Sequence, residues 1–167
     1  MSISDRLIET AGLYLREASK CRQARAYLAA CVMQVSVLEA ALMAMCFLYP
    51  SQVRRTTVSK GKKFRRKRSK ALDFTLFELI KIADELGWFP PKVITWGRRT
   101  TLAGFAHDIR KLRNFVHPGV WAPERSGTTR FNRATFEVVY EVYDVANSWI
   151  VRHVESNLAK RLMREGN

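Results

Sequence analysis

The segment from Ala26 to Tyr49 constrains the fold of this 167-residue chain more than any other, because it is apolar over almost its whole length. It reads AYLAACVMQVSVLEAALMAMCFLY and contains no Lys or Arg. A helix of this length is able to span a bilayer. Gln34, Ser36 and Glu39 lie near its middle, however, and a central carboxylate opposes insertion by about 2.5–3.5 kcal/mol. We therefore expect a helix buried in a soluble bundle, and no membrane partner.

The chain on either side of this segment also has helical periodicity. Ser4 is expected to cap a first helix, whose apolar stripe ends near Ala18. A second, longer helix is expected to begin after Ser19–Lys20 and to end at Pro50, because proline cannot continue a helix. This second helix is apolar on nearly all sides, which is typical of the central helix of a bundle.

Three further helices are expected in the second half of the chain. Thr75 and Glu78 form a capping box with Phe74 and Leu79 as a hydrophobic staple, which predicts a helix over residues 76–86. The next helix is expected to run from about residue 101 to residue 116. Asn132 is expected to cap the last helix. The apolar stripe of that helix is predicted to consist of Phe136, Tyr140, Tyr143, Asn147, Ile150, Val154 and Leu158.

No segment alternates apolar and polar residues as a strand does, and we find no internal repeat. The length suits one domain over residues 1–167. The sequence therefore predicts an all-α fold, an up-and-down bundle of four main helices with or without a short extra one.

The excess positive charge is concentrated in one segment. Ten of the 29 Lys and Arg residues lie in Arg54–Lys70, which has no acidic residue, and the rest of the chain holds 19 basic against 15 acidic residues. Residues 51–71 are therefore expected to form a long basic loop, mobile when unbound, that binds RNA or another polyanion. A solvated surface insertion is the alternative. The nucleic-acid-binding residues would be Arg54, Arg55, Lys60, Lys62, Lys63, Arg65, Arg66, Lys67, Arg68 and Lys70.

The three cysteines, Cys21, Cys31 and Cys46, lie in expected helices. An odd number without a CxxC pair argues against a disulfide framework and against a structural zinc. We expect buried thiols in a reducing compartment. The first ten residues are polar and acidic, unlike a signal peptide, so a cytoplasmic location is expected.

The segment HDIRKLRNFVHPG, residues 107–119, places several polar side chains at the end of a helix. Arg113 and His117 are four residues apart and Arg110 is seven before His117, so all three lie near one face. Pro118 puts His117 at the helix end, where the helix dipole favours its charged form and Arg113 opposes it. Such a histidine suits general acid–base chemistry. A histidine that only caps the helix is the alternative.

The stretch IRKLRNFVHPG resembles the signature of the HEPN superfamily of helical bundles, in which an arginine is followed after four to six residues by histidine. ELIKIADELGWF and AYLAACVMQVSVLEAALMAM are similar to the helices that flank this motif in bacterial HEPN-like proteins. The resemblance covers most of the chain except the basic loop and the tail. Arg110 has the family's spacing to His117, whereas Arg113–Asn114 matches its usual Arg-Asn step, so either arginine is a candidate for the family role.

The resemblance implies one of two functions. HEPN proteins include metal-independent endoribonucleases, many of them toxins or phage-defence proteins, and inactive relatives that bind nucleotides, RNA or proteins. In a ribonuclease, His117 would move the proton of the attacking 2′-OH, Arg110 and Arg113 would stabilise the phosphoryl oxygens, and Asn114 would orient the phosphate or the imidazole. The family also implies a homodimer, no metal or other cofactor, and an antitoxin or nucleotidyltransferase partner.

Other polar residues have alternative interpretations. Glu39, on the most buried helix, needs a partner, and it is expected either to hold Arg110 or Arg113 in place or to pair with an unrelated cation. His107 and His153 are expected to be surface or hydrogen-bonded residues without a role in a site. A purely structural helical bundle is the third hypothesis for the whole chain.

Overall fold

The computed structural model describes residues 1–61, 71–90, 94–95, 99–114 and 131–165, and apart from one pair of two-residue strands the regular structure over these residues is helical, as predicted. The longest helices are α1 (Ile3–Gln23), α2 (Tyr27–Leu48) and α8 (Arg133–Glu165). The shorter α5 (Leu76–Glu85) and α6 (Leu102–Asn114) follow an η1 turn (Ala71–Asp73) and precede α8. A minimal antiparallel pair, β1 (Ile94–Thr95) and β2 (Arg99–Thr100), was not predicted.

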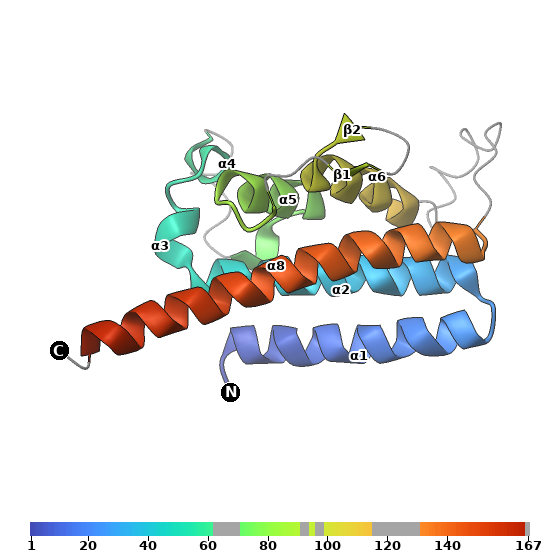
Figure 1. The fold of residues 1–167 in the computed structure, drawn as a ribbon, viewed down its shortest axis with the longest axis horizontal. Helices are drawn as coiled ribbons and strands as arrows, with labels where there is room; N and C mark the ends of the chain where they lie inside the picture. The colour runs from blue at the N-terminus through green and yellow to red at the C-terminus, as the bar shows by residue number, and fades with distance from the viewer. Residues whose placement is uncertain (62–70, 91–93, 96–98, 115–130, 166–167) are drawn as a thin grey trace.

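Helix α2 is the centre of the structure. It contacts α1, α8, α5 and α6, and the side chains along it that are almost fully buried include Leu38 and Leu42. Figure 1 shows α1 antiparallel to α2, α8 running along α2 in the same direction as α2, and α5 and α6 on the side of α2 away from α1. The predicted up-and-down arrangement of four main helices is therefore not confirmed.

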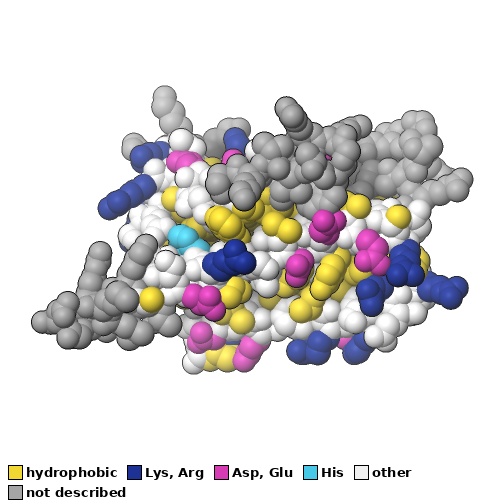
Figure 2. All heavy atoms as spheres, viewed as in Figure 1, with side chains coloured by type: hydrophobic (Ala, Val, Ile, Leu, Met, Phe, Trp, Pro, Cys, Tyr) yellow, Lys and Arg dark blue, Asp and Glu magenta, His cyan; other side chains and the backbone are white. Residues whose placement is uncertain are grey.

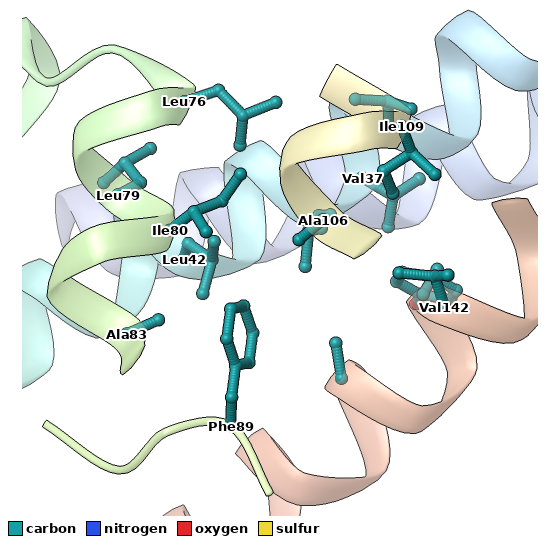
Figure 3. Packing of buried hydrophobic residues seen from close by; sticks show 14 of the residues in the cluster. Val37, Leu42, Leu76, Leu79, Ile80, Ala83, Phe89, Ala106, Ile109 and Val142 are labelled. Carbon is teal, nitrogen blue, oxygen red and sulfur yellow. The ribbon is translucent and has the colours of Figure 1, made fainter. Parts of the chain in front are cut away.

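The core is formed where α2, α5, α6 and α8 meet. Figure 3 shows Val37 and Leu42 of α2 among Ile80 of α5, Ala106 of α6 and Val142 of α8. These side chains are between 0% and 2% exposed, so their apolar area is removed from water almost completely. At about 25 cal/mol per Å² of apolar surface, this burial is the main force that holds α5 and α6 on α2.

The start of the chain differs from the prediction. Ser2, not Ser4, caps α1: its Oγ accepts from Asp5 N at 3.1 Å, and its own N donates to Asp5 Oδ2 at 2.7 Å. The helix continues past Ser19–Lys20 to Gln23, because neither residue breaks a helix. The chain turns at Arg25, whose φ of 59° lies in the left-handed region.

The other predicted caps are confirmed. Thr75 Oγ1 accepts from Glu78 N at 3.4 Å, and Thr75 N donates to Glu78 Oε2 at 2.8 Å. Gly87, with φ 67°, follows the end of α5. Asn132 Oδ1 accepts from Thr135 N at 2.9 Å at the start of α8.

The predicted loop over residues 51–71 is wrong in its first part. Helices α3 (Pro50–Val53) and α4 (Thr57–Lys60) occupy this region, and residues 62–70 lie outside the described part of the chain. Glu85 fixes α4 in place, because Thr57 N donates to its Oε1 and Oε2, each at 2.9 Å, and Thr57 Oγ1 donates to its Oε2 at 2.8 Å. The carboxylate therefore compensates the free N–H groups at the start of α4.

The predicted stripe of α8 is also partly wrong. Phe136, Tyr143 and Ile150 are buried as expected, but Tyr140 is 43% exposed. Val139 and Val142 are fully buried instead, because they face the core. Leu158 has no described side-chain environment.

One helix among the described residues, α2, is long and apolar enough to cross a membrane by length and composition alone. A buried core helix passes the same test, and 56% of its most apolar window is buried by the rest of the protein.

Candidate nucleic-acid interface

An exposed aromatic ring surrounded by cations lies on α5 and α6. Phe77 of α5 is 42% exposed, and the His107 ring of α6 lies with its centroid 4.9 Å from that of Phe77 at an interplanar angle of 40°. The Lys81 Nζ lies 5.2 Å from the Phe77 centroid, and the Arg110 guanidinium carbon lies 5.4 Å from it. We call these four residues, Phe77, Lys81, His107 and Arg110, the Phe77 surface.

The spacing of these residues along their helices explains why they meet. Phe77 and Lys81 are four residues apart on α5, and His107 and Arg110 are three apart on α6, so each pair shares one helix face. Helices α5 and α6 contact each other directly, which brings the two faces together. Each cation over an exposed ring contributes only about 0.5–1 kcal/mol, so these contacts position the side chains weakly.

Lys81 and Arg110, the two cations of the Phe77 surface, form no ion pair with a described carboxylate. Asp108 forms an ion pair with Lys111 at 3.1 Å. Within the described part of the chain, no carboxylate lies at ion-pair distance from Lys81 or Arg110. The Arg110 Nε is also buried and has no hydrogen-bond partner among the described residues. An anion beside the ring would satisfy both cations.

The surroundings of His107 favour the neutral form of its imidazole. Burial lowers its pKa below the ordinary value of 6.5, and the charges of Arg110 and Lys81 lower it further, against opposing effects of Asp108 and Asp84. Its Nδ1 is buried without a hydrogen-bond partner in the described structure. His107 is half-buried, and the expectation that it has no role in a site stays a prediction. His153 is also half-buried, and its ring packs edge-on against Tyr49 with centroids 5.4 Å apart.

The predicted Arg–His cluster is described in part. Arg110 lies on α6 and belongs to the Phe77 surface. Arg113 and Asn114 lie in the last turn of α6, but their side chains are outside the described residues, and so is His117. The juxtaposition of Arg110, Arg113, Asn114 and His117 therefore stays a prediction.

The structure describes only the first part of the basic segment, residues 54–61. Arg54, Arg55 and Lys60 are exposed. Lys62, Lys63, Arg65, Arg66, Lys67, Arg68 and Lys70 lie outside the described residues. The bond between Thr57 and Glu85 attaches the start of the segment to the last turn of α5, and η1 leads directly into the first turn of α5. The described start of the segment is thus attached to the helix that carries Phe77.

Two other predicted features have a described environment. Glu39 is half-buried on α2 and has an interaction partner, so its proposed role in holding an arginine stays a prediction. Among the residues that the structure places, no group of three or more His, Cys, Asp or Glu side chains is arranged to hold a metal ion.

The sequence interpretation missed Phe77, Lys81 and His107 as site residues. The only local signal for these residues in the sequence is a phenylalanine four residues before a lysine, and many helices contain such a pair. Comparisons with known proteins found no matching family model, no matching curated protein and no matching solved structure.

Proposed function

We propose that this protein binds single-stranded RNA on the Phe77 surface, with the basic segment Arg54–Lys70 as a second, sequence-independent contact. The observation that carries the proposal is the exposed Phe77 ring with Lys81 and Arg110 on either helix beside it. An unpaired base stacks on an exposed aromatic side chain, and adjacent cations hold the phosphates on each side of that base.

The position of the basic segment supports the same function. Its described start is joined to the last turn of α5 by the Thr57–Glu85 contact, so it begins on the helix that carries Phe77. Such a segment adds affinity by releasing counterions from the phosphate backbone and does not distinguish sequences. The alternative of a solvated insertion gives no reason for the attachment of α4 to Glu85 beside this surface.

RNA binding is tested with a fluorescently labelled oligo(U), a duplex RNA and a duplex DNA of equal length, each titrated over a series of salt concentrations. We expect the single strand to bind most tightly, because only its bases are free to stack. For single strands, the logarithm of the affinity falls with the logarithm of the salt concentration with a slope of about −0.7 per phosphate contact. Lys81→Gln is expected to reduce the slope by about 0.7. Equal affinity for all three nucleic acids would contradict stacking on Phe77.

A second, finer function is metal-independent cleavage of the bound RNA by a HEPN-type domain. The observation that favours it is that Arg110, the arginine with the family's spacing to His117, belongs to the Phe77 surface. In this proposal the bundle is HEPN-like and dimeric, it is cytoplasmic, and an antitoxin or nucleotidyltransferase controls it. A non-catalytic HEPN-like binding subunit is the alternative.

Cleavage is tested in EDTA with wild-type protein and His117→Ala at equal thermal stability. Products with 2′,3′-cyclic phosphate ends from the wild type alone would support the catalytic proposal, because they require attack by the 2′-OH. If neither protein cuts RNA that both of them bind, the catalytic proposal fails and the binding proposal stands.

A further inference from the structure

An apolar groove lies between α1 and α8. Both helices pack against α2, but they contact each other little. Two adjoining cavities of about 330 Å³ and about 250 Å³ lie between them and share Arg22 in their walls. Figure 1 shows α5 and α6, which carry the Phe77 surface, on the side of α2 away from α1. The groove is therefore separate from the surface proposed to bind RNA.

Exposed apolar side chains continue the groove along both helices. Leu15 of α1 and Tyr140 of α8 line the larger cavity. Ile8 is seven residues before Leu15 and Val151 is eleven after Tyr140, so the members of each pair share one helix face. These four side chains are between 37% and 56% exposed, and Figure 2 shows hydrophobic side chains between α8 and α1. A row of exposed apolar side chains on two neighbouring helices is typical of a surface that another chain covers.

The groove has the dimensions of one helix. Between Ile8 and Arg22, α1 rises by about 21 Å, which is about four helical turns. Because α1 and α8 both rest on α2, a further helix laid between them packs its side chains against both, as ridges of one helix pack into the grooves of another. A helix bound in this way presents apolar side chains at every third or fourth position. The shape therefore favours an amphipathic helix as the occupant.

Arginines surround the end of the groove near the turn between α1 and α2. Arg22, Arg25 and Arg133 line the smaller cavity together with Glu137, which forms an exposed ion pair with Arg133 at 3.3 Å. Within the described part of the chain, no carboxylate lies at ion-pair distance from Arg22 or Arg25. Figure 2 shows Lys and Arg side chains gathered at this end of the molecule. Carboxylates on the occupant would pair with these arginines.

The charges along α1 also favour one direction for the occupant. Asp5 and Glu9 are exposed close to the start of α1, whereas Arg22 lies in its last turn. A helix carries partial positive charge at its N-terminus and partial negative charge at its C-terminus. A helix that runs parallel to α1 therefore places its negative end at the arginines and its positive end at the carboxylates.

We propose that the groove is a docking site for an amphipathic helix of a partner protein. The helix lies parallel to α1, with its apolar face over the four exposed apolar residues and the carboxylates of its last turn beside Arg22 and Arg25. A second copy of this chain is a less favourable occupant, because each copy has a net charge of +14 and like charges repel. The site is independent of the proposed RNA binding, because it shares no residue with the Phe77 surface.

The test uses two fluorescently labelled peptides of about 18 residues, a length that covers the groove. Both carry leucine at every third or fourth position on one face, and they differ only in having glutamate or lysine in the last turn. Fluorescence anisotropy with the full chain is expected to show that the glutamate peptide binds about tenfold or more tightly than the lysine peptide. Cations stabilise the C-terminal end of an isolated helix, so this preference does not follow from the helix content of the peptides.

Two variants with matched controls locate the bound peptide. Ile8→Asp is expected to weaken binding of the glutamate peptide about tenfold or more without lowering the melting temperature, because Ile8 is exposed. Leu13→Asp makes the same change at an exposed position on another face of α1 and is expected to have no effect. Arg22→Gln is expected to reduce the preference for the glutamate peptide about fivefold or more, whereas Arg152→Gln, outside both cavities, leaves it unchanged.

Four results would overturn the proposal. The first is that neither peptide binds, or that both bind equally. The second is that Ile8→Asp and Leu13→Asp bind the glutamate peptide with the same affinity. The third is sedimentation of the wild type as a dimer that Ile8→Asp does not form, which would make the occupant a second copy. The fourth is loss of peptide binding in Phe77→Ala, which would place the helix on the Phe77 surface instead.

Discussion

The guanidinium carbon of Arg110 lies 5.4 Å from the centre of the Phe77 ring, which joins the conspicuous basic helix end of the sequence to an exposed aromatic residue on another helix. The two residues are 33 positions apart and meet because α5 and α6 pack together on α2. This contact makes Arg110 part of the Phe77 surface rather than an isolated surface cation.

Replacement of Glu85 by Gln is expected to release α4 from α5. The carboxylate accepts three hydrogen bonds from Thr57, and a neutral amide oxygen accepts fewer and weaker ones. We expect a loss of about 1 kcal/mol in the free energy of unfolding, measured by urea denaturation. Glu17→Gln is the control, because Glu17 forms only an exposed ion pair with Lys20 and its loss costs less than about 0.5 kcal/mol. If Glu85→Gln and Glu17→Gln lower the free energy of unfolding equally, the contact between Glu85 and Thr57 stabilises the fold no more than an exposed ion pair does.

The stability of the protein is expected to fall as the pH drops below 6.5, in part because of His107. Burial, Arg110 and Lys81 keep the pKa of His107 below 6.5 in the folded protein, against Asp108 and Asp84. Below pH 6.5 the unfolded chain therefore binds a proton at this position more readily than the folded chain, which favours unfolding. Well above pH 6.5, His107 is neutral in both the folded and the unfolded protein, so it no longer makes the stability depend on pH. We expect the free energy of unfolding of His107→Gln to change less with pH than that of the wild type. Urea denaturation between pH 5 and pH 8 measures this difference, a range set by the ordinary histidine pKa of about 6.5. If the free energy of unfolding of His107→Gln changes with pH as steeply as that of the wild type, His107 does not contribute to the pH dependence.

The three cysteines are expected to differ in reactivity. Burial raises the pKa of the Cys31 thiol to about 11 and that of Cys46 to about 12, whereas Cys21 is only half-buried. At pH 8, roughly one in a thousand Cys31 thiols or fewer is ionised, so neither buried thiol reacts readily. A thiol reagent at pH 8 should label Cys21 first, and Cys31 and Cys46 only on addition of denaturant. Rapid labelling of all three in the native protein would mean that α2 is not buried as described.

The turn between α1 and α2 is expected to gain stability from Arg25→Gly. Arg25 adopts a φ of 59°, and this left-handed conformation costs a residue with a side chain about 1 kcal/mol that glycine does not incur. We expect Arg25→Gly to raise the free energy of unfolding by about 0.5–1 kcal/mol, and Arg25→Ala to leave it nearly unchanged because the strain remains. A loss of stability in Arg25→Gly alone would contradict the described turn.

The parts of the fold that depend on neighbouring residues were predictable from the sequence. The Thr75–Glu78 capping box and the Asn132 cap involve residues three apart, and a short polar side chain before an apolar run carries that signal on its own. The burial of α2 followed from its uniform apolar composition. The misplaced Tyr140 shows the limit of this reasoning, because a stripe drawn one position away on α8 fits the same periodicity.

The parts that depend on distant residues were not predictable. Helix α4 is stabilised by Glu85, which lies 28 positions after Thr57, so the basic composition around it suggested only a loop. The turn at Arg25 has a left-handed conformation without a glycine, so the sequence contains no signal for it. The Phe77 surface arises from residues on two helices, and the sequence does not reveal which faces of those helices meet.

The most direct test of the proposed function is the affinity for single-stranded oligo(U) of Phe77→Ala, Phe77→Tyr and Leu13→Ala. Stacking contributes about 1–3 kcal/mol per base, so Phe77→Ala is expected to weaken binding roughly 5- to 150-fold, while Phe77→Tyr retains it. Leu13 is similarly exposed, at 47%, but lies on α1, and its replacement should have no effect. If Phe77→Ala binds as tightly as the wild type and Leu13→Ala, the Phe77 surface does not bind RNA.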